Sequence, residues 1–214
     1  MIFELDNVEL YFKNKRILGG IYLKAETGKV TAILGRNGCG KSSLLNIAFG
    51  NLKPKYKLIR LDNKPLLKPL YTTGFAKYLP QYNFIPDGMK LCFIFKLYTL
   101  DWTTFVENFE AFSIYKNYKF KALSGGERRV IETYIILKTQ SKIVILDEPF
   151  THLSPMYIET VKQIIAEEKK CKIILISDHM YQHIIDASDT IYLLKNGTTK
   201  KIENSTELET YNYL

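Results

Sequence analysis

The sequence predicts an α/β fold: a mainly parallel sheet with crossover helices, an antiparallel β region at the N-terminus and a small helical layer. In the C-terminal half, short apolar runs alternate with amphipathic helical stretches, as strands and crossover helices do in a parallel sheet. The first thirty residues alternate apolar and polar side chains with a period of two. Residues 87–120 are rich in aromatic side chains at spacings of three or four, which indicates helices.

The first half of the chain reads as strands followed by a strand–turn–helix unit. Two or three short antiparallel strands are expected in residues 1–29, with a buried strand at Val30–Leu34. After a glycine-rich turn, the apolar spacing predicts a helix over Lys41–Phe49, ended by Gly50. Four prolines in residues 51–80 favour loops and edge strands there.

The second half alternates helices and strands. After the helical layer of residues 87–120, whose aromatic residues we interpret as packing, we expect a mainly parallel sheet and its crossovers. An Asn196-Gly197 pair predicts a hairpin turn, followed by a polar tail with one helical turn. The expected elements are a helix over Ser124–Lys138, a strand at Ile143–Leu146, a helix through Ile158, Val161 and Ile165, and strands at Ile173–Ile176, Thr190–Leu194 and Lys200–Ile202.

The composition is that of a folded globular chain. Of its 214 residues, 46% are apolar and 24% charged, which excludes disordered and collagen-like chains, and the length suits one domain over residues 1–214. The longest apolar stretch, 91–100, is too short to span a bilayer, and the N-terminus lacks the features of a signal peptide. We therefore expect a cytoplasmic location, with any membrane role supplied by a partner.

The net charge and the cysteine content do not point to a single class of protein. The net charge of +8 is compatible with a nucleic-acid surface, with acidic lipid head groups or with a lysine-rich solvated exterior. Only five arginines are present and the lysines are scattered, which favours the solvated exterior. The three cysteines, Cys39, Cys92 and Cys171, lack metal-ligand spacing and suit reduced thiols.

A phosphate-binding motif follows the strand at Val30–Leu34. Residues 35–42, GRNGCGKS, match the pattern G-x-x-x-x-G-K-[ST] between a predicted strand and a predicted helix. In that setting, glycines let backbone N–H groups approach phosphate oxygens at a helix N-terminus. Lys41 supplies a charge to the β- and γ-phosphates, and the Ser42 hydroxyl can join the ligands of Mg²⁺. The alternative is a simple glycine turn. The predicted strand before the motif and the predicted helix after it argue against that alternative.

Two other predicted strands end in residues with catalytic chemistry. The strand at Ile143–Leu146 leads into Asp147, suited to holding Mg²⁺, and Glu148, suited to polarising an attacking water. Apolar strands that end in an acidic residue are common. The catalytic interpretation of this pair therefore depends on the phosphate loop found in the same chain. Another strand leads into Ser177-Asp178-His179, which would place His179 at the same sheet edge, within reach of the γ-phosphate.

A second anion-binding helix start is expected at Leu123-Ser124-Gly125-Gly126-Glu127. Ser124 occupies an N-cap position and Glu127 completes a capping box, so locally this is a well-capped helix. The two glycines also expose backbone N–H groups that the first phosphate loop does not need. This raises the hypothesis that the segment serves a nucleotide bound by another subunit.

The ordered set GRNGCGKS, Gln81 in YLPQ, LSGGE, ILDEP and SDH resembles the nucleotide-binding domain of ATP-binding cassette (ABC) ATPases. The resemblance extends over nearly the whole chain. It implies a P-loop ATPase core, with residues before Gly35 as the antiparallel β subdomain and residues 87–138 as the helical subdomain. LSGGE is the signature that distinguishes this family.

The resemblance implies a head-to-tail dimer around two Mg-ATP molecules. Glu148 would be the catalytic base, His179 would bind the γ-phosphate, and Gln81 would sense Mg²⁺ and the attacking water. Metal ligands would be Ser42, Gln81 and Asp147. Either Tyr11 or Phe12 would stack on adenine, and we prefer Phe12 because a loop follows it. The implied ATP-binding residues are Phe12, Gly35, Asn37, Gly38, Cys39, Gly40, Lys41, Ser42, Ser43 and, from the other subunit, Ser124, Gly125 and Gly126.

The chain departs from the family pattern in two places. Ser154 stands where the family usually has an aspartate that couples the two active sites, so we expect altered coupling between subunits. The segment from Gln81 to Ser124 is also short, which leaves the form of a partner-docking groove open.

We expect the ATP-hydrolysing subunit of an ABC transporter, with separate membrane-spanning subunits and a second nucleotide-binding subunit as partners. The alternatives are a soluble ABC ATPase acting on nucleic acid or ribosomes, and an ATP-binding regulator with weak turnover. The chain has neither a long coiled-coil insertion nor a second cassette, which argues against the nucleic-acid class.

Overall fold

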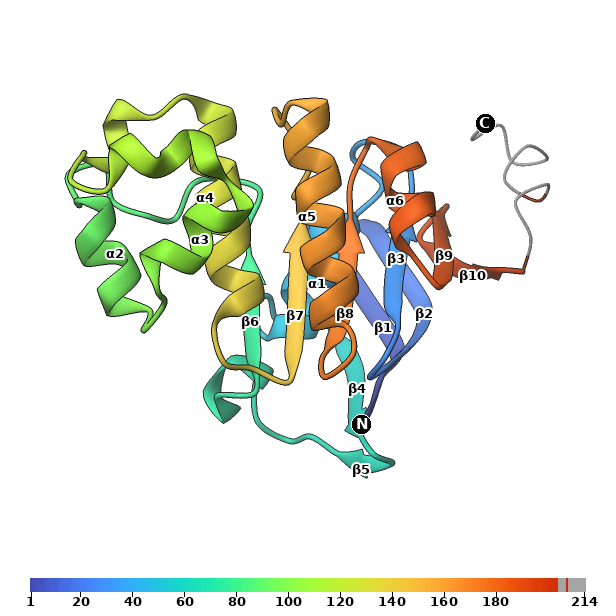
Figure 1. Cartoon of the computed structure of the whole chain (residues 1–214). Helices are drawn as coiled ribbons and strands as arrows, with labels where there is room; N and C mark the ends of the chain where they lie inside the picture. Colours follow the sequence, from blue (N-terminus) through green and yellow to red (C-terminus); the bar gives the residue numbers. More distant parts are fainter. Residues whose placement is uncertain (204–206, 208–214) are drawn as a thin grey trace.

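The computed structural model describes residues 1–203 and residue 207, and these form two sheets with helices around the larger one (Figure 1). The first sheet is antiparallel, with strand order β2-β1-β4-β5. Strands β1 and β2 are longer than expected, and three irregularities in their pairing bend the ribbon. Its strands are β1 (Ile2–Phe12), β2 (Lys15–Glu26), β4 (Tyr56–Leu61) and β5 (Lys64–Pro65).

The second sheet confirms the predicted mainly parallel core. Its strand order is β10-β9-β3-β8-β7-β6, and every pairing from β9 to β6 is parallel. Only β10 is antiparallel, as expected for the return strand of the Asn196-Gly197 hairpin. The strands are β3 (Val30–Leu34), β6 (Ala76–Leu79), β7 (Ile143–Asp147), β8 (Ile173–Ser177), β9 (Thr190–Lys195) and β10 (Thr198–Ile202).

Alternating side chains of the central strands pack into cores on opposite faces of this sheet. Helices α4 and α5 lie on one face of the sheet and α1 on the other (Figure 1). Val144 and Leu146 of β7 pack into the core with α4 and α5, whereas Ile143 and Ile145 pack into the core with α1 and the antiparallel sheet. Burial on both faces explains the continuous apolar runs of these strands. The α-helices are α1 (Lys41–Phe49), α2 (Leu91–Leu97), α3 (Trp102–Asn108), α4 (Gly125–Lys138), α5 (Pro155–Glu168) and α6 (Tyr181–Ala187), with 3-10 turns at Leu70–Thr73, Glu110–Tyr115 and Phe120–Ala122.

The helical layer packs around one aromatic residue. Phe105 is fully buried, and its ring centroid lies 4.9–5.3 Å from those of five other rings. Four of these rings belong to the predicted aromatic segment and the fifth is Tyr134 of α4. The interpretation of the aromatic residues as packing is confirmed for this cluster, which fixes the layer to α4. The partners of Phe105 are Phe95, Trp102, Phe109, Phe112 and Tyr134.

Three details differ from the sequence-based expectation or extend beyond it. Two long strands replace the two or three short ones expected before Val30. Helix α6 was not predicted, because seven residues are too few to show a clear helical period. The helical turn expected in the polar tail falls within residues 203–214, most of which lie outside the described part of the chain.

Candidate functional site

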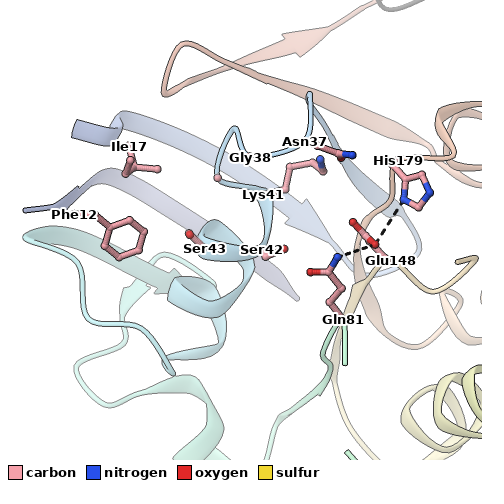
Figure 2. Close-up of a pocket in the computed structure, with 11 residues that line it drawn as sticks. Phe12, Ile17, Asn37, Gly38, Lys41, Ser42, Ser43, Gln81, Glu148 and His179 are labelled. Carbon is pink, nitrogen blue, oxygen red and sulfur yellow. Dashed lines mark hydrogen bonds and ion pairs between the residues drawn. The ribbon is translucent and has the colours of Figure 1, made fainter. Parts of the chain in front are cut away.

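A cavity of about 540 Å³ lies where the phosphate loop meets the ends of the parallel strands. In Figure 2, Phe12 and Ile17 lie at one end of this cavity, and Gln81, Glu148 and His179 lie at the other. Crevices at the carboxyl ends of parallel strands are the usual ligand sites of such sheets. The remaining lining residues, between these ends, are Asn37, Gly38, Gly40, Lys41, Ser42 and Ser43.

The start of α1 is suited to an anion. Gly40 precedes the helix with φ of 109°, a left-handed conformation that a side chain would strain. Among the described residues, no side chain caps this terminus and no acidic residue lies in its first turn. The buried Lys41 ammonium donates to the carbonyl oxygens of Gly35 (2.7 Å) and Arg36 (3.3 Å). The helix terminus and Lys41 together provide positive potential for phosphate groups.

Glu148 lies at the centre of the polar end of the cavity. Its Oε2 accepts a hydrogen bond from Gln81 Nε2 at 3.0 Å and lies 3.6 Å from His179 Nδ1 (Figure 2). Thr151 Oγ1 lies 3.4 Å from the same oxygen. The backbone of Glu148 has φ of 55°, an uncommon conformation that marks a constrained position directly after β7. The structure thus brings Glu148 and His179 to the same sheet edge, as their places after two predicted strands suggested, and Gln81 lies beside them.

Asp147 is buried beside Glu148 and is held by hydroxyl groups. Its oxygens accept hydrogen bonds from Ser177 Oγ at 2.9 Å and from the Tyr78 hydroxyl at 3.1 Å. Burial raises the pKa of Asp147, whereas hydrogen bonds with Ser42, Ser177 and Tyr78 oppose this shift. The Tyr78 hydroxyl in turn accepts from Asn46 of α1 at 3.0 Å. This chain of contacts links α1, β6 and β7 behind the cavity.

The signature segment lies outside the lining of this cavity. Ser124 caps α4, and both hydrogen bonds of the predicted capping box with Glu127 are present. Gly125 lines a separate cavity of about 340 Å³, which shares Gln81 and Glu148 with the first. A Cβ atom at residue 126 would lie 2.4 Å from the His152 carbonyl oxygen, so Gly126 also has a structural reason to be glycine. In the part of the chain that the structure describes, the phosphate loop lines the first of these two cavities and the signature residue Gly125 lines the second.

Of the remaining predicted residues, some line the cavity and others do not. Phe12 lines the cavity with about half of its surface exposed, whereas Tyr11 contacts the Lys55 ammonium, 5.2 Å from its ring centroid. Gly35 and Cys39 belong to the loop but lie behind its lining residues.

Ser154 stands where the family usually has an aspartate. It accepts a hydrogen bond from the backbone N–H of Tyr157 and caps α5. Serine and aspartate are comparable N-caps, so this departure preserves the start of the helix.

Sequence reasoning missed several residues at the site. Ile17 follows the β1–β2 hairpin and lines the cavity next to Phe12, a placement that only the pairing of the two strands reveals. Tyr78 and Arg129 contact the strand ends from neighbouring elements. The detectable signal for Arg129 was its spacing of one helical turn from the oppositely charged Glu132, with two apolar residues between them.

A strand, a glycine-rich loop and a helix N-terminus facing a carboxylate pair define a P-loop ATPase. The chain belongs to the ABC transporter family: the family model described as "ABC transporter" matches residues 18–151. It is accordingly an ATP-binding protein and an ATPase of the ABC type. The five ordered motifs therefore identified the family correctly from sequence alone.

Similar proteins include both import and export ATPases. The chain is 31% identical over 211 residues to the arabinose import ATP-binding protein AraG of Mannheimia succiniciproducens, covering 91% of this chain and 42% of that protein. It is 25% identical over 230 residues to the lipopolysaccharide export system ATP-binding protein LptB of Haemophilus influenzae, covering 97% of this chain and 95% of that protein. The chain thus spans less than half of the first relative, and the two relatives differ in transport direction.

Solved structures agree with the fold. An ATP-binding subunit of an ABC transporter superimposes with a TM-score of 0.85 at 19% identity, covering 100% of this chain and 94% of that one. A nucleotide-free ATP-binding cassette from an ABC transporter gives a TM-score of 0.79 at 23% identity, covering 98% and 94%. In the described ranges of this chain, none of the helices combines the length and apolar character that a membrane span requires.

Proposed function

We propose that the chain is the energy-supplying subunit of an ABC transporter. Two such subunits would close head to tail around two ATP molecules and drive transport through separate membrane-spanning subunits, on the cytoplasmic face of the membrane. The observation that carries this proposal is the division of the site: one cavity holds the phosphate loop and Glu148, while Ser124–Gly126 lie outside it. A second subunit would supply the missing signature.

Each end of the cavity suits one part of ATP. The Phe12 ring offers a stacking face for adenine, next to the apolar side chain of Ile17. The start of α1 and Lys41 would bind the phosphates. Glu148 would accept the proton of the attacking water, and His179 would contact the γ-phosphate from the neighbouring strand. Gln81 donates to Glu148 and would contact the attacking water beside it.

The oxygen groups near the phosphate loop fit Mg²⁺. The Ser42 hydroxyl, the Asp147 carboxylate and the Gln81 amide are hard oxygen donors of the kind this ion prefers. Burial raises the pKa of Asp147 and the nearby Ser42 hydroxyl lowers it, so two of the three proposed ligands lie close together. When bound, Mg²⁺ would neutralise charge on the phosphates.

A mixing experiment tests the shared site. Lys41→Ala disables the loop of a chain, and Ser124→Arg blocks its signature, so each variant alone is expected to be inactive. A mixed dimer keeps one intact site, formed by the loop of one variant and the signature of the other. Half of the dimers in an equal mixture are mixed, so Mg-ATP turnover should return to roughly a quarter of the parent value. An equal mixture that stays inactive, although both variants fold, would contradict the head-to-tail arrangement.

The adenine-binding role of Phe12 has a neighbouring control. Stacking of a base on an aromatic side chain contributes about 1–3 kcal/mol, so Phe12→Ala should raise the Kd for ATP about tenfold or more. Tyr11→Ala removes an aromatic side chain of the same strand that contacts Lys55 instead. It should change the Kd less than about twofold. Titration calorimetry would compare the two, and a larger effect at Tyr11 would reverse the assignment.

A further inference from the structure

Helix α4, which begins at the signature, carries two buried charged side chains that no proposed role uses. Arg129 is 5% exposed and Glu132 is fully buried, one helical turn apart on the face that packs against the parallel sheet. Buried charges are costly unless hydrogen bonds compensate them. Their partners therefore indicate what these side chains hold in place.

Arg129 holds the backbone at the ends of two strands. Its guanidinium donates to the carbonyl oxygens of Pro80 (2.7 Å), Asp147 and Glu148 (2.9 and 3.1 Å). Pro80 directly precedes Gln81. One side chain thus fixes the backbone on which both Gln81 and Glu148 stand.

Glu132 holds the other end of the segment that contains Gln81. Its Oε1 accepts from the backbone N–H groups of Phe84 (2.7 Å) and Ile85 (3.1 Å). Its Oε2 has no hydrogen-bond partner among the described residues and lies 3.9 Å from Arg129 Nη1. Gln81 therefore lies in a loop that is anchored on both sides by one helix.

We infer that Arg129 and Glu132 are positioning residues that hold Gln81 and Glu148 in fixed relation to the helix that begins at Ser124. Any displacement of α4 then carries Gln81 and Glu148 with it. A nucleotide bound at the signature of this chain would thereby act on the hydrolytic residues of the same chain's own site. The inference rests on the proposed roles of Gln81 and Glu148, and Arg129 and Glu132 act only through them.

Two substitutions of Glu132 test whether the length of its side chain or its negative charge is what the loop requires. Glu132→Asp keeps the charge but withdraws the carboxylate, whereas Glu132→Gln keeps an oxygen acceptor at the same reach. Glu132→Asp should lower kcat about tenfold with KM for ATP within about twofold of the parent. Glu132→Gln should restore kcat to within about threefold of the parent. Lys138→Gln, on the same helix but paired with Glu167 and Glu168, is the control and should keep the parent kcat.

Amide hydrogen exchange measured by NMR gives a readout that does not depend on turnover. The Phe84 and Ile85 amides should exchange about tenfold faster in Glu132→Asp than in the parent or in Glu132→Gln, with other core amides unchanged. Parent kcat in Glu132→Asp, or a lower kcat with unchanged exchange at these amides, would overturn the inference.

If Glu132→Asp does not fold, a second variant tests the same inference. Arg129→Lys keeps the charge but cannot reach several carbonyl groups at once, so it should lower kcat in the same way. In the unmodified chain, exchange at Phe84 and Ile85 as fast as at the exposed Tyr82 would overturn the inference without any variant. If Glu148→Gln retains turnover, the proposed function fails, whereas the exchange measurement still decides whether Glu132 holds the loop.

Discussion

Glu148→Gln is expected to lower kcat for ATP hydrolysis at least about 100-fold while leaving ATP binding intact. A positioned general base contributes about 10²–10⁴-fold, and an amide cannot accept the proton of the attacking water. Glutamine has the shape of glutamate and still offers an oxygen to Gln81 and Thr151, so the surrounding contacts should persist. The loss should therefore appear in kcat and not in the Kd for ATP.

The same variant should also trap the closed dimer. If hydrolysis reopens the two subunits, a subunit pair that binds Mg-ATP without hydrolysing it stays closed. Size-exclusion chromatography with Mg-ATP should then show a dimer for Glu148→Gln and a monomer after the nucleotide is removed. Glu167→Gln, an exposed glutamate on α5, is the matched control. Turnover in Glu148→Gln within threefold of this control would remove Glu148 from the role of base.

The sequence predicted the parallel core well because its signals are local. Strands buried on both faces read as continuous apolar runs, and Val30–Leu34 and Ile143–Asp147 are examples. Glycine and the capping residues mark where helices begin and end, as Gly50 does for α1 and Ser124 for α4. Such signals need only a few neighbouring residues.

The contacts around the site could not be predicted in the same way. The bond from Tyr78 to Asp147 and the bonds from Arg129 to Pro80 join residues far apart in the chain, and they depend on how β6, β7 and α4 pack. The choice between Tyr11 and Phe12 depends on the bulged register of β1 and β2, which alternation alone does not specify. Tertiary packing thus decides the details of the site, whereas local patterns decide its components.

Lys41→Ala is expected to weaken ATP binding about 100-fold. Hydrogen bonds to charged groups contribute about 1.5–3 kcal/mol each, and Lys41 would make such bonds to two phosphates. Its ammonium donates to the carbonyl oxygens of Gly35 and Arg36, so the charge is directed into the loop. Because binding itself is lost, Kd should rise, in contrast to Glu148→Gln.

The control for this prediction is Lys162→Ala, which removes an equal charge from α5, where Lys162 pairs with Glu159 and Asp186. Fluorescence titration with a labelled ATP analogue would compare the two Kd values, and circular dichroism would establish that both variants fold. A rise of less than about threefold in Lys41→Ala would mean that the backbone N–H groups at the start of α1 hold the phosphates largely by themselves. The lysine would then serve to order the loop, because its two carbonyl contacts tie Gly35 and Arg36 to the first turn of the helix.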